Sequence, residues 1–185
     1  FFMENKYKFT KYKTLLCEWS KRMNLVAPST LSDIDNRHIA DSAQLANFLP
    51  ANTDIIDLGS GAGFPGIPLK VSMPEVNITL LDSLKKRINF LDAVCEALQL
   101  QGISTVHSRA EDGAKNKQYR EKFDIATARA VASLPTLCEY CLPYVKVGGI
   151  FLAMKGHAED EIEQAKKAIV TLGGTIEDVK EFVLP

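Results

Sequence analysis

The stretch Asp54–Leu69, DIIDLGSGAGFPGIPL, decides the fold, because a short apolar run leads directly into a glycine-rich loop. Two nucleotide-binding patterns overlap in this loop. Counted from Gly61, the stretch contains G-x-G-x-x-G, the fingerprint of dinucleotide-binding proteins. Counted from Asp57, it contains D-x-G-x-G-x-G, a pattern typical of S-adenosylmethionine-dependent methyltransferases. Both patterns predict a buried strand, a tight loop and a helix, so they differ only in the cofactor.

The residues beside the glycines distinguish the two cofactors. A carboxylate at Asp57 would repel a pyrophosphate, whereas it suits the ammonium group of a methionine moiety, directly or through water. Pro65 and Pro68 remove N–H donors from the first turn of the following helix, which weakens that helix as an anion-binding site. The sequence therefore favours S-adenosylmethionine over a dinucleotide, and a glycine loop without any ligand stays as a third interpretation.

From residue 51 onward, apolar runs alternate with segments of helical periodicity. The predicted strands are Ile55–Leu58, Ile78–Leu81, Ile103–His107, Phe123–Ala128 and Ile150–Met154, and the predicted helices are Ile67–Val71, Leu84–Leu100, Ser133–Val145 and Glu159–Leu172. Such alternation implies right-handed crossovers and a parallel sheet with helices on both faces. We therefore expect one α/β domain over residues 51–185. Its last segment, TIEDVKEFVLP, has the pattern of a beginning strand, so we expect this domain to lack its C-terminal strands.

Residues 1–50 have a different pattern. Apolar and aromatic residues recur at helical spacing from Tyr7 to Leu25, and a second helical stretch is expected from about Leu31 to Leu49, before Pro50. We expect these residues to form an N-terminal helical extension that packs on the core.

The composition limits the class of protein. The 185 residues carry a net charge of −1 and are 46% hydrophobic, which is typical of a globular domain and gives no overall basic signature for nucleic acid. No apolar run approaches the roughly 18 residues that a membrane span needs. Cys138 and Cys141 form one C-x-x-C without a second ligand pair, and the histidines do not cluster. We therefore expect a cytoplasmic monomer that binds neither a membrane nor a metal ion.

Two later segments are expected to complete a cofactor site. Asp82 ends the predicted strand NITLLD, where a carboxylate can accept hydrogen bonds from both ribose hydroxyls. This feature does not discriminate between NAD and S-adenosylmethionine. Ala110 and Glu111 follow the next strand in HSRAED, where their backbone groups could read the edge of an adenine. The alternative for HSRAED is an ordinary solvated loop.

The segment after the fourth predicted strand limits the reaction. FDIATARAVASL places Arg129 where amino-group methyltransferases carry an Asn/Asp-Pro-Pro-aromatic motif, and it lacks the Pro-Cys of carbon-5 pyrimidine methylation. What remains is a substrate whose own lone pair attacks the methyl group, such as nitrogen 7 of guanine, so we expect no catalytic acid or base. Arg129 could bind the guanine or a phosphate, hold the cofactor carboxylate, or pair with the loop, and these roles stay open.

Five segments in chain order resemble one family: DLGSGAGFPGIPL, LLDSLKKRINFL, HSRAED, ATARAVASL and AMKG. They are similar to RsmG, the glucose-inhibited division protein B family of bacterial ribosomal RNA guanine-N7 methyltransferases. EWSKRMNLV and RHIADSAQL also match the N-terminal helices of that family. The resemblance implies a Rossmann-like class I S-adenosylmethionine-dependent methyltransferase with an N-terminal helical extension, acting on 16S ribosomal RNA or on the small ribosomal subunit. Carried over by position, it implies cofactor contacts at Gly59, Phe64, Ala110, Glu111 and Arg129.

The residues and the resemblance together give one set of candidates. The expected cofactor contacts are Asp57, Gly59, Gly61, Phe64, Asp82, Ala110, Glu111 and Arg129, and the expected substrate contacts are Arg129, Lys155 and Arg37. The run Lys85–Arg87 is interpreted either as a solvated helix face or as contacts to RNA phosphates. Two other functions stay as alternatives: a small-molecule methyltransferase, and a non-catalytic RNA-binding assembly module with a vestigial cofactor pocket.

Overall fold

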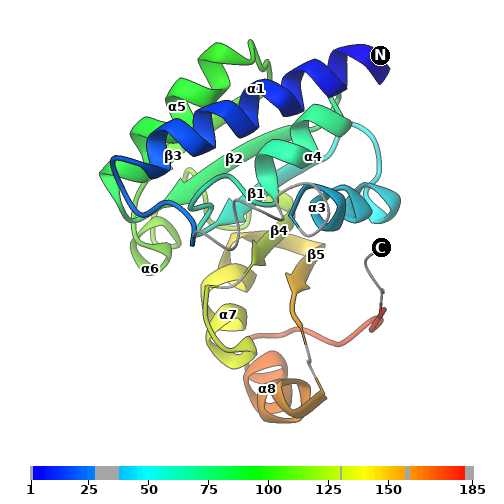
Figure 1. Ribbon diagram of the computed structural model, residues 1–185. Helices are drawn as coiled ribbons and strands as arrows, with labels where there is room; N and C mark the ends of the chain where they lie inside the picture. The colour runs from blue at the N-terminus through cyan, green and yellow to red at the C-terminus, as the bar shows by residue number, and fades with distance from the viewer. Residues whose placement is uncertain (1, 28–37, 130, 157–158, 182–185) are drawn as a thin grey trace.

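The computed structural model describes residues 2–27, 38–129, 131–156 and 159–181. Its centre is a parallel sheet with the strand order β3-β2-β1-β4-β5 (Figure 1). The strands are β1 (Asp54–Leu58), β2 (Asn77–Asp82), β3 (Ile103–His107), β4 (Phe123–Arg129) and β5 (Val145–Met154). Each strand that the sequence predicts is present, and the expected α/β fold is confirmed.

Strand β1 lies at the centre of the sheet, and its side chains are buried on both faces. Ile55, Ile56 and Leu58 are each at most 1% exposed, and a strand covered on both faces has such a continuous apolar run. β1 pairs with β2 on one side and with β4 on the other, so the order of the strands reverses beside it. Ligands of open parallel sheets bind beyond the carboxyl ends of the strands at such a switch point. The glycine loop that follows β1 lies there.

One face of the sheet is covered by α1 (Phe2–Ser20), α4 (Gly66–Ser72) and α5 (Lys85–Ala97) (Figure 1). Their apolar side chains form one core with Ile55. Helix α1 contacts both α4 and α5, and its Tyr12 is fully buried in this core. Helix α1 is therefore the N-terminal helix that packs against the sheet domain.

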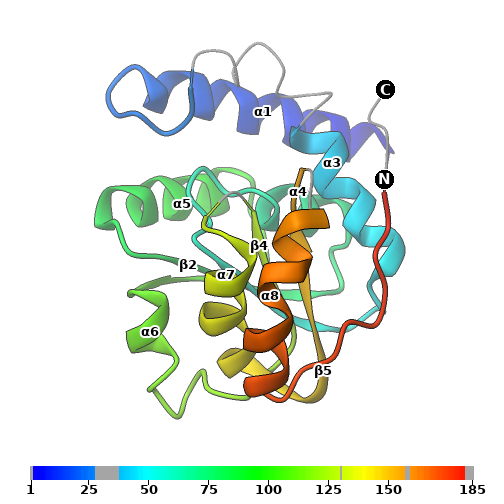
Figure 2. The ribbon, with the colours of Figure 1, turned by 90° about the horizontal axis from the view of Figure 1, so that it is seen from below.

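The opposite face carries α6 (Ala110–Gly113), α7 (Leu134–Cys141) and α8 (Glu159–Thr171) (Figure 2). Residues of α6 and α7 form a second core with Ile56, while α8 packs on α7. Neighbouring residues of a strand point to opposite faces, which is why Ile56 and the residue before it belong to different cores. Of the stretch HSRAED, Ala110 to Asp112 begin helix α6, while Ser108 and Arg109 connect β3 to that helix.

The second predicted N-terminal helix, Leu31–Leu49, lies partly outside the described residues. Its described part forms α3 (Ala40–Gln44) and the short 3-10 helix η2 (Leu45–Phe48), and α3 contacts α4. Helix α1 ends at Ser20, earlier than the expected Leu25, because the backbone closes in a turn on the carbonyl of Trp19.

The predicted helix Ser133–Val145 is too long. Helix α7 ends at Cys141, a 3-10 turn η3 (Leu142–Tyr144) follows, and β5 already begins at Val145. Pro143 has no backbone N–H and cannot continue an α-helix, so the chain turns and enters the sheet there.

The strand expected in TIEDVKEFVLP is not found in its described part. Residues 175–181 have no regular secondary structure and are exposed. No described strand lies beside them, so their backbone groups lack the partners that a sheet ladder requires. The residues after 181 lie outside the described part of the chain.

Candidate active site

The glycine loop connects β1 to α4 at the carboxyl edge of the sheet (Figure 1). Gly59, Gly61 and Gly63 have φ angles of 68°, 58° and 97°, a left-handed backbone that glycine adopts without a steric penalty. A Cβ placed on Gly61 would meet no atom closer than 3.7 Å, the carbonyl oxygen of Gly59. The loop backbone at Gly61 is therefore open to the close approach of a ligand.

Backbone hydrogen bonds and Asp82 fix this loop to the end of β2. The N–H of Gly59 donates to the carbonyl of Leu81 at 2.8 Å. The Asp82 carboxylate accepts the N–H of Gly61 at 2.9 Å with Oδ2 and the N–H of Leu84 at 2.8 Å with Oδ1. Asp82 thus joins the loops that follow β1 and β2, and its contact with ribose hydroxyls stays a prediction.

Asp57 lies beneath the start of α4 and is 0% exposed. Its Oδ2 accepts the N–H of Gly66 at 3.1 Å, while its Oδ1 has no hydrogen-bond partner. Burial raises the pKa of Asp57 from 3.8 to about 7, and the hydrogen bond from Gly66 opposes that rise. Thr127 is the register partner of Asp57 on β4, and its buried Oγ1 also has no partner. Two polar atoms are therefore left unsatisfied between these adjacent strands, and a cofactor contact of Asp57 stays a prediction.

Arg129 ends β4 and is held by three residues from two other segments. Its guanidinium carbon lies 4.7 Å from the centroid of the Phe64 ring, a cation–π arrangement with the glycine loop. One terminal nitrogen donates to Oδ2 of Asp41 at 3.3 Å, and the other lies 2.7 Å from Nδ1 of His38. The Arg129 side chain is 14% exposed. Of the three roles that the sequence left open for Arg129, the structure contains the contact with the loop, and the two ligand contacts stay predictions.

Ala110 and Glu111 begin helix α6 directly after β3. The carbonyl of Ala110 accepts a hydrogen bond from the Tyr144 hydroxyl at 2.6 Å, and the side chain of Glu111 is exposed. Strand β3 pairs with β2 up to His107. The first turn of α6 therefore lies at the same sheet edge as the glycine loop, as the adenine contact requires, and that contact itself stays a prediction.

The segment after β4 covers the first glycine of the loop. A Cβ on Gly59 would lie 2.7 Å from Cγ2 of Val131, so the Val131 side chain packs directly on the Gly59 backbone. Val131 is nevertheless 41% exposed. It forms a partly exposed apolar wall beside the loop, which the sequence pattern did not indicate.

Lys155, a predicted substrate contact, is engaged within the protein. Its ammonium lies 2.8 Å from Oε2 of Glu161 and donates to the carbonyl of Ala132 at 2.9 Å. The same Glu161 oxygen accepts the N–H of Leu134 at 2.6 Å. The Lys155 ammonium and the backbone N–H of Leu134 lower the pKa of Glu161. Lys155 and Glu161 together anchor residues 131–134, and a contact of Lys155 with substrate stays a prediction.

The remaining substrate candidates are less defined. Arg37 lies outside the described residues. In the run Lys85–Arg87, the Arg87 side chain lies 3.4 Å from Asp82 while Lys85 and Lys86 are exposed. Arg87 thus takes part in the loop architecture, and a phosphate contact of the two lysines stays a prediction.

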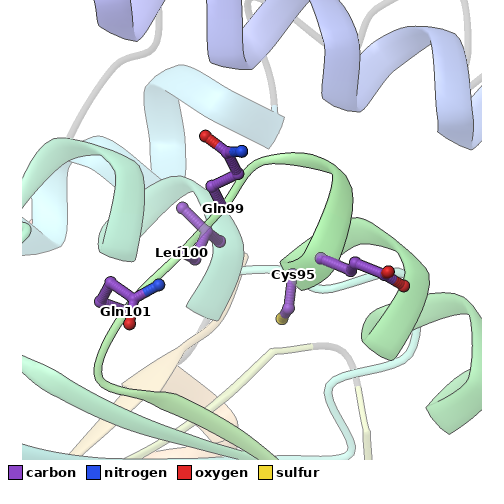
Figure 3. A pocket seen from close by; sticks show the side chains of 5 residues that line it. Cys95, Gln99, Leu100 and Gln101 are labelled. Carbon is purple, nitrogen blue, oxygen red and sulfur yellow. The ribbon is translucent and has the colours of Figure 1, made fainter.

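Two surface hollows lie away from this region. One is lined by Cys95 and the turn from Gln99 to Gln101 at the end of α5 (Figure 3). The other includes Asp54, Asn77 and Phe123, which begin β1, β2 and β4. Both hollows therefore lie toward the amino ends of the strands, and neither belongs to the glycine-loop site.

The structure brings most candidates to one edge of the sheet. Asp57, Asp82 and Arg129 end or nearly end three adjacent strands, and the glycine loop lies between them. Tyr12 and Val131 are additional residues of the site. Tyr12 donates a hydrogen bond to the carbonyl of Ala62 at 2.6 Å, although its sequence signal was only that of a buried helix position.

Two structural features are absent from the described residues. Among them, no helix has the length and apolar character of a membrane span. Within the same ranges, no group of His, Cys, Asp and Glu side chains is arranged to hold a metal ion.

The fold and the site place the chain in a class of proteins, the Rossmann-like class I methyltransferase fold. A solved S-adenosylmethionine-dependent methyltransferase from Aquifex aeolicus superposes with a TM-score of 0.58 at 18% identity, covering 83% of this chain and 87% of that one. A precorrin-6y C5,15-methyltransferase from Geobacter metallireducens gives a TM-score of 0.55 at 16% identity, covering 72% of this chain and 68% of that one. Likeness at this level of identity defines the fold alone.

Sequence comparison is more specific. A family model described as rRNA small subunit methyltransferase G (GidB) matches residues 5–185. The ribosomal RNA small subunit methyltransferase G of Acetivibrio thermocellus is 54% identical over 179 residues, which is 96% of this chain and 74% of that protein. Its counterpart in Clostridium novyi is 50% identical over 184 residues, or 97% of this chain and 76% of the relative. The chain belongs to the rRNA small subunit methyltransferase G family.

Proposed function

We propose that the protein transfers a methyl group from S-adenosylmethionine to nitrogen 7 of a guanine in 16S ribosomal RNA. The observation that carries the proposal is the position of Arg129, at the end of β4 and against Phe64 of the glycine loop, in a chain of this family. Amino-group methyltransferases carry a different motif at that point. The site therefore suits an acceptor atom that needs positioning rather than deprotonation.

The start of helix α4 supports S-adenosylmethionine over a dinucleotide. Pro65 and Pro68 have no N–H, the N–H of Gly66 donates to Asp57, and the N–H of Ile67 donates to the carbonyl of Gly63 at 2.7 Å. These amides are not available to a pyrophosphate, which a dinucleotide site would bind at a helix N-terminus.

The cofactor would be held by the open backbone at Gly61 and by groups at the strand ends. The buried Oδ1 of Asp57 and the hydroxyl of Thr127 lack partners, so the site contains polar atoms that an ammonium group or a bridging water could satisfy. A bound S-adenosylmethionine would supply an electrophilic methyl group on its sulfonium. The residues present fit that cation, because Asp57 and Asp82 place carboxyl groups near the ends of β1 and β2, beside the glycine loop.

The chain itself contributes orientation. Nitrogen 7 of guanine carries a lone pair and no proton at neutral pH, so no general base is required. Arg129 offers N–H donors at the edge of the site, and O6 of guanine is an acceptor that it could hold while the lone pair of the neighbouring N7 stays free to attack the methyl group. Holding the base in line with the methyl group accounts for a large part of the barrier reduction in such reactions. Phe64, which is buried, and Val131, which is partly exposed, supply apolar surfaces at the glycine loop.

The test uses small ribosomal subunits from cells that lack the enzyme, together with methyl-labelled S-adenosylmethionine. Label is expected in 7-methylguanosine after digestion of the 16S ribosomal RNA. Absence of label there would refute the proposal. Label that enters metabolites but not RNA would favour a small-molecule methyltransferase, and a calorimetric titration without cofactor binding would favour an assembly module.

We further propose that the protein acts as a cytoplasmic monomer on the small ribosomal subunit or its RNA, with residues 1–50 as a helical extension and residues 51–185 as the methyltransferase domain. The many buried contacts of α1 with the sheet domain support this division into extension and core. Sedimentation equilibrium tests the monomer, and co-sedimentation with small subunits tests the partner.

A further inference from the structure

Residues outside β4 orient the side chain of Arg129, which lies at the end of that strand. The two terminal nitrogens of its guanidinium contact His38 and Asp41, and its Cζ lies over the ring of Phe64. The His38 ring also lies against Phe64, with centroids 5.3 Å apart. His38 and Asp41 belong to the N-terminal region and precede Arg129 by 91 and 88 positions in the chain. In these contacts, the N-terminal region therefore supplies both polar partners of Arg129.

The 2.7 Å contact between Arg129 and His38 fixes the protonation of the histidine. Arginine is always protonated in proteins and has donors but no acceptor. Nδ1 of His38 must therefore carry a lone pair, and the ring proton must be on Nε2. A doubly protonated His38 would place an N–H against an N–H and a positive charge against a positive charge.

We propose that His38 is a positioning residue, whose neutral imidazole holds Arg129 over Phe64 in the orientation that cofactor binding and methyl transfer use. Its protonation breaks the contact and releases the guanidinium. The expected effect on methyl transfer rests on the proposed function, whereas the expected tautomer of His38 concerns only the chain itself.

Other titratable groups face the same arginine and must be separated from His38. Asp41 comes from α3, and Asp57 comes from β1 and interacts with Arg129 electrostatically. Tyr12 comes from α1, and burial raises the pKa of its phenol well above the ordinary value, so it stays neutral in the relevant range. Asp57 titrates near neutrality and is the group that could imitate an effect of His38.

Two variants of His38 distinguish its role as a hydrogen-bond acceptor from its role as an aromatic ring that packs against Phe64. Asparagine places a carbonyl oxygen close to the position of Nδ1, so His38→Asn keeps an acceptor that does not titrate. Phenylalanine keeps a ring against Phe64 but has no acceptor, so His38→Phe removes the hydrogen bond to Arg129. Loss of a hydrogen bond to a charged group corresponds to an expected loss of about 10- to 100-fold in cofactor affinity for His38→Phe.

The first experiment needs neither cofactor nor RNA. Nitrogen-15 spectra of histidine-labelled protein, with His38 assigned from the His38→Asn variant, are expected to show the Nε2–H tautomer with an unprotonated Nδ1 at pH 7.5. An Nδ1–H tautomer or a charged ring at that pH would overturn the inference.

The second experiment measures S-adenosylmethionine affinity and kcat/KM on small subunits between pH 5 and 8. The wild-type protein is expected to lose both as His38 becomes protonated, and His38→Asn is expected to abolish that part of the acid loss while staying within about threefold of wild type at pH 8. An acid loss that is unchanged in His38→Asn and removed in Asp57→Asn would assign the effect to Asp57 and overturn the inference.

The two experiments also separate this inference from the proposed function. If wild-type protein binds cofactor with the expected pH dependence but labels no ribosomal RNA, the proposed function fails and the role of His38 stands. If RNA is labelled and His38→Phe behaves as wild type in both affinity and kcat/KM, the proposed function stands and the role of His38 fails.

Discussion

At the scale of single residues, Asp57 is a buried carboxyl group whose pKa lies near neutrality. The pKa of Asp57 is raised from 3.8 to about 7, mainly by burial. The folded protein therefore binds this proton more tightly than the unfolded chain does. The stabilising contribution of Asp57 is complete below about pH 4 and is lost as the pH rises through about 7.

We expect Asp57→Asn to be more stable than the wild type at pH 8, by about 1–3 kcal/mol, and similar in stability at pH 5. Asparagine keeps an acceptor for the N–H of Gly66 and carries no charge at either pH. Thermal unfolding at the two pH values measures the difference. A variant that is less stable than wild type at pH 8 would show that the ionised carboxylate is satisfied in solution.

Gly66 is required for a steric reason. A Cβ at this position would lie 2.3 Å from Cδ2 of Leu80 and 2.8 Å from Oδ2 of Asp57. We expect Gly66→Ala to lower the free energy of unfolding by about 1–3 kcal/mol, because the start of α4 must move away from β2. Urea denaturation measures this loss. Gly156→Ala is the matched control, since its Cβ would meet no atom within 4 Å, and equal losses in the two variants would contradict the steric explanation.

At the scale of elements, the anchor formed by Lys155 and Glu161 connects the end of β5, helix α8 and the segment after β4. The partly buried ammonium of Lys155 contacts a carboxylate and a backbone carbonyl, and both contacts fix residues 131–134. This segment carries Val131 against Gly59. The position of a helix on the far face of the sheet is thereby coupled to the glycine loop.

The salt dependence of RNA binding distinguishes an anchor from an RNA contact. A lysine that contacts one phosphate contributes about one unit to the slope of log affinity against log salt concentration. We expect Lys155→Met to leave that slope unchanged and to slow methyl transfer, because the segment over Gly59 loses its anchor. Lys117→Met removes an exposed charge before β4 and is the control for net charge. A slope reduced by about one in Lys155→Met alone would instead support the substrate contact.

At the scale of the whole molecule, helix α1 is connected to the glycine loop by a buried hydrogen bond. The Tyr12 hydroxyl donates to the carbonyl of Ala62 at 2.6 Å, and the Tyr12 ring lies 5.6 Å from that of Phe64. The N-terminal region therefore contacts the loop directly, in addition to the polar contacts of His38 and Asp41.

We expect Tyr12→Phe to lower the free energy of unfolding by about 1–2 kcal/mol, because the buried carbonyl of Ala62 loses its donor. We also expect weaker cofactor binding, since that carbonyl belongs to the glycine loop. Calorimetric titration and urea denaturation measure the two effects. Tyr7→Phe is the control, as Tyr7 is 65% exposed, and an unaltered cofactor affinity in Tyr12→Phe would show that α1 does not influence the loop.

The sequence was sufficient to predict the sheet and the loop on which the candidate site is built. Apolar runs such as DIIDL fix a strand by local pattern, and the glycines with Asp57 and Asp82 fix the loops at its carboxyl edge. Both are local signals, because a few consecutive residues determine strand, turn and helix. The fold class could be predicted for this reason, together with the family resemblance that the comparisons support.

Contacts between distant segments could not be predicted in this way. Nothing in the spacing of Lys155 indicates that Glu161 and a backbone carbonyl at Ala132 engage its charge. Similarly, the sequence placed Asp57 beside the loop, but burial beneath α4 and the missing partner of Oδ1 depend on how the helix packs. Such features follow from tertiary packing, which decides whether a polar residue is exposed or enclosed.

Trp19 has a consequence of its own, because it is the single tryptophan of the chain. Its ring lies edge-on to Phe90 of α5, with centroids 5.6 Å apart, at the junction between α1 and the sheet domain. Intrinsic fluorescence excited at the indole band therefore originates at that junction. Detachment of α1 would change the emission while the far-ultraviolet circular dichroism of the sheet domain persisted. The protein thus contains a built-in optical probe for following the N-terminal helix separately from global unfolding.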